Sequence, residues 1–279
     1  PDLFWGLRGA GANFGIATSL EFELHQFSGT LHRGVHIHPA SDIHDLWAMF
    51  RDFATRAPET VAAIFTVALA EPAASYADAV AGQPIVVISY NHSGAGEDVE
   101  RDVAPLLAGP KPASASGTTE PYLQAQRSSD LLLDWGSRSF IMGGYLADCP
   151  PDVLDALVAH VEQVPGESSI SITAMGGAID RLPDEASAYT GRGRPFDVSP
   201  DTSWSDPALD GANATWVRDA MAIVEPHLVP GRYINELSDG GPEITRSSYG
   251  DAKLERLRQI KRAWDPTNVF RLNHNIDPA

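Results

Sequence analysis

Several stretches of this chain alternate apolar and polar residues, and this period of two predicts β-strands. Within residues 16–24, the side chains of Leu20 and Phe22 fall on one face and that of Glu21 falls on the other. Such a pattern is typical of a strand with one buried face. Similar patterns predict further strands at residues 31–38, 61–69, 84–90, 138–146 and 168–175.

Other stretches repeat apolar residues every three or four positions, which is the period of an α-helix. After Ser41, for example, Leu46, Phe50 and Phe53 recur at this spacing. Helices are predicted at residues 3–8, after Ser41, and at 99–107, 151–161, 213–224 and 248–264. The stretch 109–119 is rich in Gly, Pro, Ser and Ala, and a loop is predicted there.

Units of two strands and a helix recur more often than strict alternation of strand and helix does. Strict alternation would favour a parallel sheet, whereas the observed order favours antiparallel pairing. The expected fold class is therefore α+β, with a mostly antiparallel sheet covered by helices on one face.

Length and charge narrow the classes of function. The chain has 279 residues, enough for one large domain or two medium ones. Its net charge of −17 would repel a phosphate backbone, so no nucleic-acid partner is expected. No apolar run reaches the roughly 18 residues of a membrane-spanning helix, and no membrane association is expected. The single cysteine, Cys149, excludes an intrachain disulfide.

Three glycines, Gly9, Gly11 and Gly15, form a small-residue turn after the first predicted helix. Their spacing is one residue too long for the dinucleotide-binding pattern, and a strand is predicted where that pattern needs a helix. A Rossmann-type site is therefore rejected. The glycines would still allow the backbone to approach a flat or phosphorylated ligand, but a plain tight turn explains them equally well.

The sequence gives little support for a metal site or for a hydrolase. His36 and His38 alternate on a predicted strand, but no Asp, Glu or Cys set nearby completes a metal shell. Solvated strand histidines are the favoured interpretation, and no metal is expected. Ser93 lacks the G-x-S-x-G elbow, which argues against an unrelated serine hydrolase.

The C-terminal segment is rich in aromatic, amide and apolar residues, although chain ends are usually frayed. Tyr233 and Asn235 follow a Pro-Gly turn, and Asn273 lies in the closing run 265–276. Asn side chains both donate and accept hydrogen bonds, as recognition of the carbonyl and imide edges of a heterocycle requires. A capped helix with a packed tail is the alternative interpretation.

Three segments carry a family resemblance. Residues 2–18 read DLFWGLRGAGANFGIAT, the region 176–198 contains GGAI and F-x-V, and YIN at 233–235 precedes a closing DPTNVFRLNHNI. In order and spacing these resemble segments of berberine-bridge-enzyme-like flavoproteins, which belong to the vanillyl-alcohol-oxidase superfamily. The resemblance covers essentially the whole chain.

The resemblance implies an FAD-dependent oxidoreductase, in which hydride passes from a small organic substrate to the flavin and oxygen or another acceptor reoxidises it. It implies that residues 1–27 are the C-terminal piece of an FAD-binding domain, 28–230 the substrate domain, and 231–279 a segment that returns to the FAD domain. It also implies that the front of the FAD domain is missing from this chain. A non-catalytic substrate-binding fragment of the same scaffold is the alternative.

The resemblance further implies which residues lie at the cofactor. Asn13, Gly15 and Ile16 match the segment whose backbone runs along it. Tyr233 and Asn235 match residues near the flavin ring, and Asn273 of the closing segment is assigned to the cofactor as well.

Tyr233 is the candidate catalytic residue, either as an acid–base group or as a phenol that orients the substrate. A phenol with a pKa of about 10 needs a neighbouring cation to act as a base at neutral pH. Glu236 stands where relatives carry an aromatic residue. It is either an alternative base or, as the sequence favours, a solvated carboxylate.

Overall fold

The computed structural model describes residues 2–70, 80–128, 130, 136–164, 167–272 and 274–278. In these residues, nine strands form one sheet in the order β4-β1-β3-β2-β7-β8-β6-β9, with β5 paired to β8. All strand pairs are antiparallel. The strands are β1 (Thr30–Pro39), β2 (Val61–Leu69), β3 (Pro84–His92), β4 (Ser114–Pro121), β5 (Arg138–Ile141), β6 (Gly144–Leu146), β7 (Glu167–Ala174), β8 (Phe196–Trp204) and β9 (Leu228–Val229).

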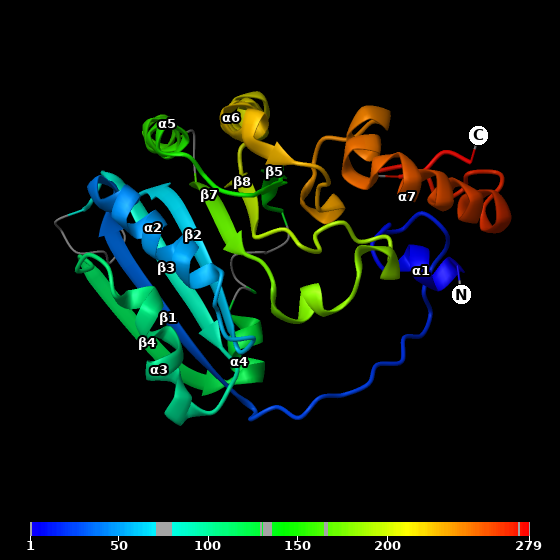
Figure 1. Ribbon diagram of the computed structural model, residues 1–279. Coiled ribbons are helices and arrows are strands. Elements are labelled where there is room, and N and C mark those ends of the chain that lie inside the picture. Colours follow the sequence, from blue (N-terminus) through cyan, green and yellow to red (C-terminus); the bar gives the residue numbers. More distant parts are fainter. Residues whose placement is uncertain are drawn as a thin grey trace.

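Helices cover one face of this sheet, as Figure 1 shows. The helices are α1 (Asp2–Leu7), α2 (Ile43–Ala54), α3 (Val99–Val103), α4 (Tyr122–Arg127), α5 (Pro151–Val161), α6 (Asp210–Val224) and α7 (Pro242–Trp264). Side chains of α2, α5 and α6 share one buried core with β2, β3, β7 and β8. At its centre, the ring of Trp47 lies 5.4 Å from that of Phe65 and 5.0 Å from that of Phe196. The expected α+β class is confirmed.

The opposite face of the sheet is polar along β7 and β8. Because Phe196 and Val198 point into the helix-covered core, the alternate residue Asp197 points to the other face. There Asp197 is paired with Thr173 of β7 and with Tyr145 of β6. We call this side of the sheet, marked by Tyr145, Thr173 and Asp197, the open face.

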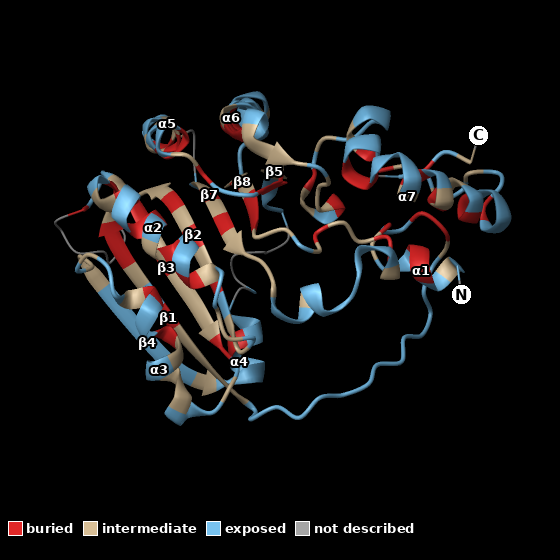
Figure 2. Ribbon diagram, in the orientation of Figure 1, coloured by how far each residue is buried: buried red, intermediate tan, exposed pale blue. Residues whose placement is uncertain are grey.

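The two chain ends pack against each other in a second core. Trp5 and Phe14 from the N-terminal segment are buried with Leu257 and Ile260 of α7 and with Ile276 of the tail. Figures 1 and 2 show α1 beside the orange and red C-terminal helix, with buried residues between them. The C-terminal segment is thus held by packing, which agrees with the alternative interpretation of a packed tail.

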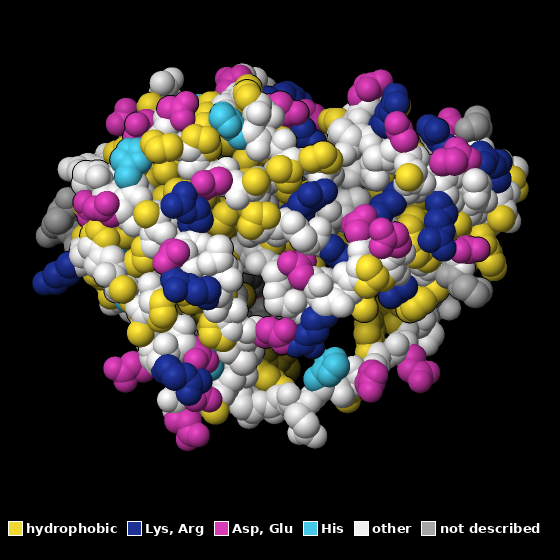
Figure 3. Space-filling model, viewed as in Figure 1, with side chains coloured by type: hydrophobic (Ala, Val, Ile, Leu, Met, Phe, Trp, Pro, Cys, Tyr) yellow, Lys and Arg dark blue, Asp and Glu magenta, His cyan; other side chains and the backbone are white. Residues whose placement is uncertain are grey.

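The strand predicted at residues 16–24 is absent. This segment is extended but pairs with no strand in the described part of the chain. Its apolar side chains are largely solvent-accessible, with Ile16 81% and Leu24 90% exposed. Figure 3 shows an opening, rimmed partly by hydrophobic atoms, between this stretch and the body of the molecule. The residues do alternate between apolar and polar, but a strand also needs a neighbouring strand for its backbone hydrogen bonds.

Other differences from the sequence predictions have local causes. The predicted loop 109–119 contains the start of β4, an edge strand of small residues in which Gly117 lies opposite Gly34. Met142 and Gly143 divide the strand predicted at 138–146 into β5 and β6. Helix α7 begins at Pro242, ahead of the prediction, and is interrupted at Gly250, where φ is +70°. Strand β8 was not predicted.

Candidate active site

The glycine-bearing turn of residues 9–15 is fastened to the C-terminal tail through Asn13. Its side-chain Nδ2 donates to the carbonyls of Ala10 at 2.7 Å and His274 at 3.2 Å. Its Oδ1 accepts from the backbone N–H of Ile276 at 3.0 Å. With its side chain only 4% exposed and fully engaged, Asn13 fixes the turn, and any contact to a ligand would come from the backbone.

A buried ammonium group joins the same three segments. Lys261 of α7 is completely buried, and its Nζ donates to the carbonyl of Asn13 at 2.7 Å, to Asp265 Oδ2 at 2.7 Å and to the carbonyl of Phe270 at 2.6 Å. Asp265 also accepts from the backbone N–H groups of Val269 and Phe270. Lys261 therefore holds the N-terminal turn, the end of α7 and the tail in one arrangement.

A cavity of about 590 Å³ lies between this turn and the segment that follows Tyr233. It is lined by Ala10, Gly11, Ala12, Asn13, Ile234, Asn235, Leu237, Ser238, Gly240, Leu272 and His274. The Nε2 of His274 donates to the carbonyl of Leu237 at 2.7 Å, which leaves Nδ1 as a buried acceptor with no partner in the described residues. Asn13 and Asn235, far apart in the sequence, thus line one cavity.

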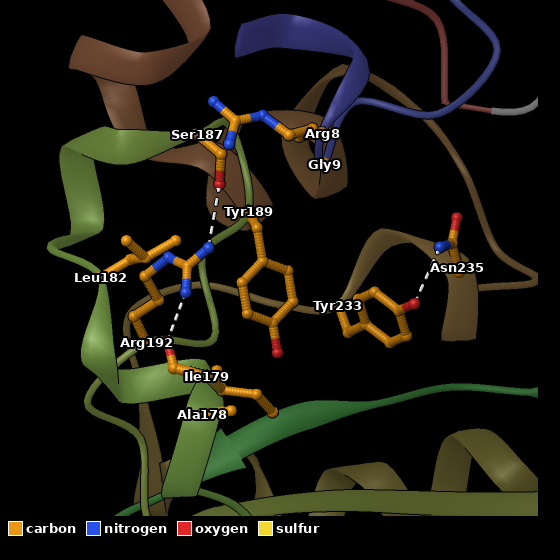
Figure 4. A pocket seen from close by; sticks show the side chains of 10 residues that line it. All are labelled: Arg8, Gly9, Ala178, Ile179, Leu182, Ser187, Tyr189, Arg192, Tyr233 and Asn235. Atoms are coloured by element: carbon orange, nitrogen blue, oxygen red, sulfur yellow. Dashed lines mark hydrogen bonds between the residues drawn. The ribbon is translucent and has the colours of Figure 1, made fainter. Parts of the chain in front are cut away.

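Asn235 also lines a second cavity of about 500 Å³, in which Tyr189 and Tyr233 stand close together (Figure 4). Their ring centroids are 5.8 Å apart at an interplanar angle of 82°. The hydroxyl of Tyr233 accepts from Asn235 Nδ2 at 3.0 Å. The guanidinium of Arg192 lies 5.6 Å from the centroid of Tyr189 and donates to the carbonyl of Ile179 and to Ser187 Oγ. The cavity therefore combines phenols, an amide and a cation.

The loop that carries Tyr189 is held from both chain ends. The backbone N–H of Tyr189 donates to the carbonyl of Arg8 at 3.1 Å, and that of Ala188 donates to the carbonyl of Trp5 at 3.2 Å. From α7, Lys253 Nζ donates to the carbonyl of Tyr189 at 2.6 Å. The position of the Tyr189 ring thus depends on the packing of the two termini.

At Gly9 the N-terminal turn packs directly against the backbone of Ala188 and Tyr189. Replacing Gly9 should therefore disturb the packing of the loop that carries Tyr189. A Cβ at Gly9 would collide with the backbone of Ala188 and Tyr189, and its φ of +137° disfavours other residues. We expect Gly9→Ala to lower the free energy of unfolding by about 2–5 kcal/mol. Gly11 is the control, because it also has positive φ but open space around its Cβ. Gly11→Ala should cost about 1 kcal/mol in urea unfolding, and equal losses would contradict the role of Gly9.

Two carboxyl groups near the tyrosines are withdrawn from solvent: Asp197 is buried, and Glu236 is half-buried with its Oε2 covered. Burial, with a smaller effect of Glu236, raises the pKa of Asp197 to about 8. Burial also raises the pKa of Glu236, and the charge of Asp201 adds to the increase. Burial raises the pKa of the Tyr145 phenol, which is fully buried next to Asp197 in the sheet. Strongly shifted groups that share one site are typical of acid–base chemistry.

The favoured interpretation of Glu236 as a solvated carboxylate is therefore wrong, because Oε2 of Glu236 is buried. His38 is buried as well, contrary to the solvated strand histidine that was favoured. Across the residues with described positions, no group of three or more His, Cys, Asp or Glu could hold a metal ion. The same part of the chain has no helix both long and apolar enough to cross a membrane.

The remaining sequence-predicted site residues are less clustered. Gly15 has open space around it, and Ile16 is 81% exposed at the start of the unpaired stretch. Asn273 lies outside the described residues. Tyr145, Tyr189 and Asp197 were not predicted from the sequence. Only the alternation in residues 196–202 could have indicated that Asp197 belongs to a strand.

This arrangement, an antiparallel sheet with the two chain ends packed together beside it, resembles known proteins in sequence and in fold. Residues 232–277 match the protein family described as "Berberine and berberine like". The chain is 25% identical to the FAD-linked oxidoreductase iacH of Pestalotiopsis fici, covering 97% of this chain and 55% of that protein. The resemblance predicted from the sequence is confirmed.

Solved structures agree in fold. BBE-like 1 of Physcomitrella patens superposes with a TM-score of 0.82 at 16% identity, covering 100% of this chain and 61% of that one. A berberine bridge enzyme variant, H174A, solved in complex with (S)-reticuline, gives a TM-score of 0.81 at 16% identity, with the same coverage of each chain. The chain thus spans between 55% and 61% of the length of these proteins.

Proposed function

We propose that this chain supplies the substrate-facing part of an FAD-dependent oxidoreductase that removes hydride from a small organic molecule. One observation carries the proposal: the N-terminal turn and the Tyr233–Asn235 segment meet at adjoining cavities. Likeness to FAD-linked oxidoreductases over the whole chain supports it. The small-molecule substrate is supported by the reticuline bound to a structural relative. The proposal includes residues 28–230 as the substrate domain and both ends, 1–27 and 231–279, as parts of the FAD domain.

The residues present fit the ring end of FAD. The 590 Å³ cavity between the N-terminal turn and the segment after Tyr233 is lined by apolar side chains, backbone and amides. The unpartnered Nδ1 acceptor of His274 also belongs to this lining. A flat heterocycle with hydrogen-bond donors and acceptors satisfies such a lining. Its described lining has no Lys or Arg, so these residues would not hold the pyrophosphate. When bound, FAD would supply the hydride acceptor, and its reoxidation would require oxygen or another acceptor.

The chain's own residues would then position the substrate and handle its proton. We assign the backbone of Asn13, Gly15 and Ile16, with the side chain of Asn235, to the cofactor side. Tyr233, whose hydroxyl is fixed by Asn235, is assigned as the catalytic acid–base or substrate-orienting phenol. Arg192 and Tyr189 form the opposite wall of the cavity (Figure 4).

Replacing Tyr233 should impair the chemical step without loss of the fold. In the complete flavin-loaded protein, Tyr233→Phe is expected to slow flavin reduction by substrate about 10²–10⁴-fold. The visible absorption of the bound flavin should stay unchanged. Tyr122→Phe is the matched control, because Tyr122 is 45% exposed on α4 and lines neither cavity.

Stopped-flow absorbance of the flavin during anaerobic mixing with candidate substrates measures this step. Rates for Tyr233→Phe equal to those of Tyr122→Phe would remove Tyr233 from the site. A complete protein that purifies colourless and gains no flavin spectrum with FAD would overturn the proposed function. Substrate binding without any flavin spectrum would instead support the non-catalytic alternative.

A further inference from the structure

In the described structure, Asp197 and Glu236 each have a buried carboxyl oxygen that accepts no hydrogen bond. Asp197 is 6% exposed, and its Oδ1 has no hydrogen-bond partner among the described residues. Oε2 of Glu236 is likewise buried and unpartnered there. Burying an ionised carboxylate without a partner costs free energy. Such a group is therefore either protonated or positioned to receive a hydrogen bond or a proton from a ligand.

The fold brings the segment that carries Glu236 to the open face of the sheet, where Asp197 also points. The segment 232–238 is fastened along the β5–β6 connection, since Ser238 N–H donates to the carbonyl of Ile141 at 2.8 Å and Arg232 Nη1 donates to that of Gly143 at 3.1 Å. A Cβ at Gly143 would lie 3.3 Å from Glu236 Oε2 and 3.5 Å from the carbonyl of Val198. Glu236 therefore sits over Gly143, beside the backbone of β8 that carries Asp197.

Among the residues whose positions are described, no cation pairs with either carboxyl group. Tyr145 and Tyr189 face Asp197, and Asp201 lies on the same side of β8 with its Oδ1 accepting from Ser169. Arg192 is directed to Ile179 and Ser187, and Arg232 pairs with Glu225. In the described chain, neither Asp197 nor Glu236 forms an ion pair.

We propose that Asp197 and Glu236 share one proton at neutral pH and together form the proton acceptor of the site. This step rests on the proposed function. An O–H or N–H bond of the substrate breaks, its electron pair stays on the substrate, and the proton forms an O–H bond with the ionised carboxyl of the pair. Tyr233 then orients the substrate, because its hydroxyl has Asn235 and no Lys or Arg as its described hydrogen-bond partner.

A titration of the carboxyl groups tests the sharing directly and needs no flavin. The chain would be labelled with ¹³C at the Asp and Glu carboxyl carbons and followed by NMR from acid to alkaline pH. One carboxyl should remain protonated through neutral pH and titrate with an apparent pKa near 8. Asp197→Asn should abolish this step, and Glu236→Gln should move it to lower pH, because a like charge is removed. Glu162→Gln, at an exposed position, should leave it unchanged.

The wild-type titration is informative even if a variant does not fold. If every carboxyl of the wild-type chain is ionised at pH 7, or the high step persists in Asp197→Asn, the sharing is wrong. In the complete flavin-loaded protein, Glu236→Gln should shift the pH midpoint of flavin reduction, and an unchanged pH profile would overturn the catalytic part. A shared proton in a protein that never reduces flavin would leave the sharing intact and reject the proposed function.

Discussion

Replacing Lys261 with Met is expected to lower the free energy of unfolding by about 3–5 kcal/mol. The substitution leaves Asp265 as a buried carboxylate without its cation and leaves the carbonyls of Asn13 and Phe270 without their shared donor. These groups belong to the N-terminal turn, the end of α7 and the C-terminal tail. Loss of the Lys261 hydrogen bonds should therefore also loosen the cavity between the turn and the segment after Tyr233. Urea unfolding followed by tryptophan fluorescence measures the change.

Arg262→Met is the control for Lys261→Met. Arg262 is the next residue of α7, but its ion pair with Glu255 is half exposed and should contribute at most about 1 kcal/mol. A loss for Lys261→Met as small as that of the control would show that the buried ammonium does not hold the termini together.

The hydrogen bonds between Lys261 and Asp265 also predict that the stability of the folded protein falls in acid. Burial alone would raise the pKa of Asp265, but hydrogen bonds from Lys261 and from the backbone of Val269 and Phe270 outweigh it and lower the pKa to about 2. The stabilisation is therefore present above the ordinary carboxyl pKa and is lost as pH falls from about 4 towards 2.

Asp197→Asn should change stability in the opposite pH direction. The pKa of Asp197 is raised by burial to about 8 in the folded protein, so the folded state binds a proton that the unfolded chain releases near pH 4. The wild type should thus lose stability as pH rises through this interval, and the Asn variant should lose less. The advantage of the variant should grow from pH 5 to pH 8 by at most about 4 kcal/mol.

Thermal unfolding at a series of pH values measures this difference. Glu162→Gln, at an exposed position, is expected to follow the wild type at every pH. Parallel curves for wild type and Asp197→Asn would show that Asp197 is ionised in the folded protein at neutral pH.

Much of the sheet was predictable because its strands carry their own signal. In β2, alternate side chains such as Phe65 and Val67 are buried against helices, so period and burial coincide. The unpaired stretch 16–24 has the same alternation, but hydrogen bonding to a neighbouring strand cannot be read from it. Strand β4 was missed for the opposite reason, since Ser, Ala, Gly and Thr carry little apolar signal at a sheet edge.

The candidate site was only partly predictable. Tyr233 and Asn235 were found through resemblance, and their contact follows from their spacing of two residues. Asp197 was missed, because an acidic residue is ordinarily solvated and nothing local shows that β6, β7 and segment 232–238 enclose it. Its burial is a property of the tertiary arrangement, as is the meeting of Gly9 with the loop carrying Tyr189.

The most direct test of the account is a crystal structure of the complete protein loaded with FAD. We expect the flavin ring to lie between the backbone of residues 11–15 and Asn235, with Tyr233 and the Asp197–Glu236 pair facing the substrate side. A flavin ring bound away from both the N-terminal turn and the Tyr233–Asn235 segment would contradict it.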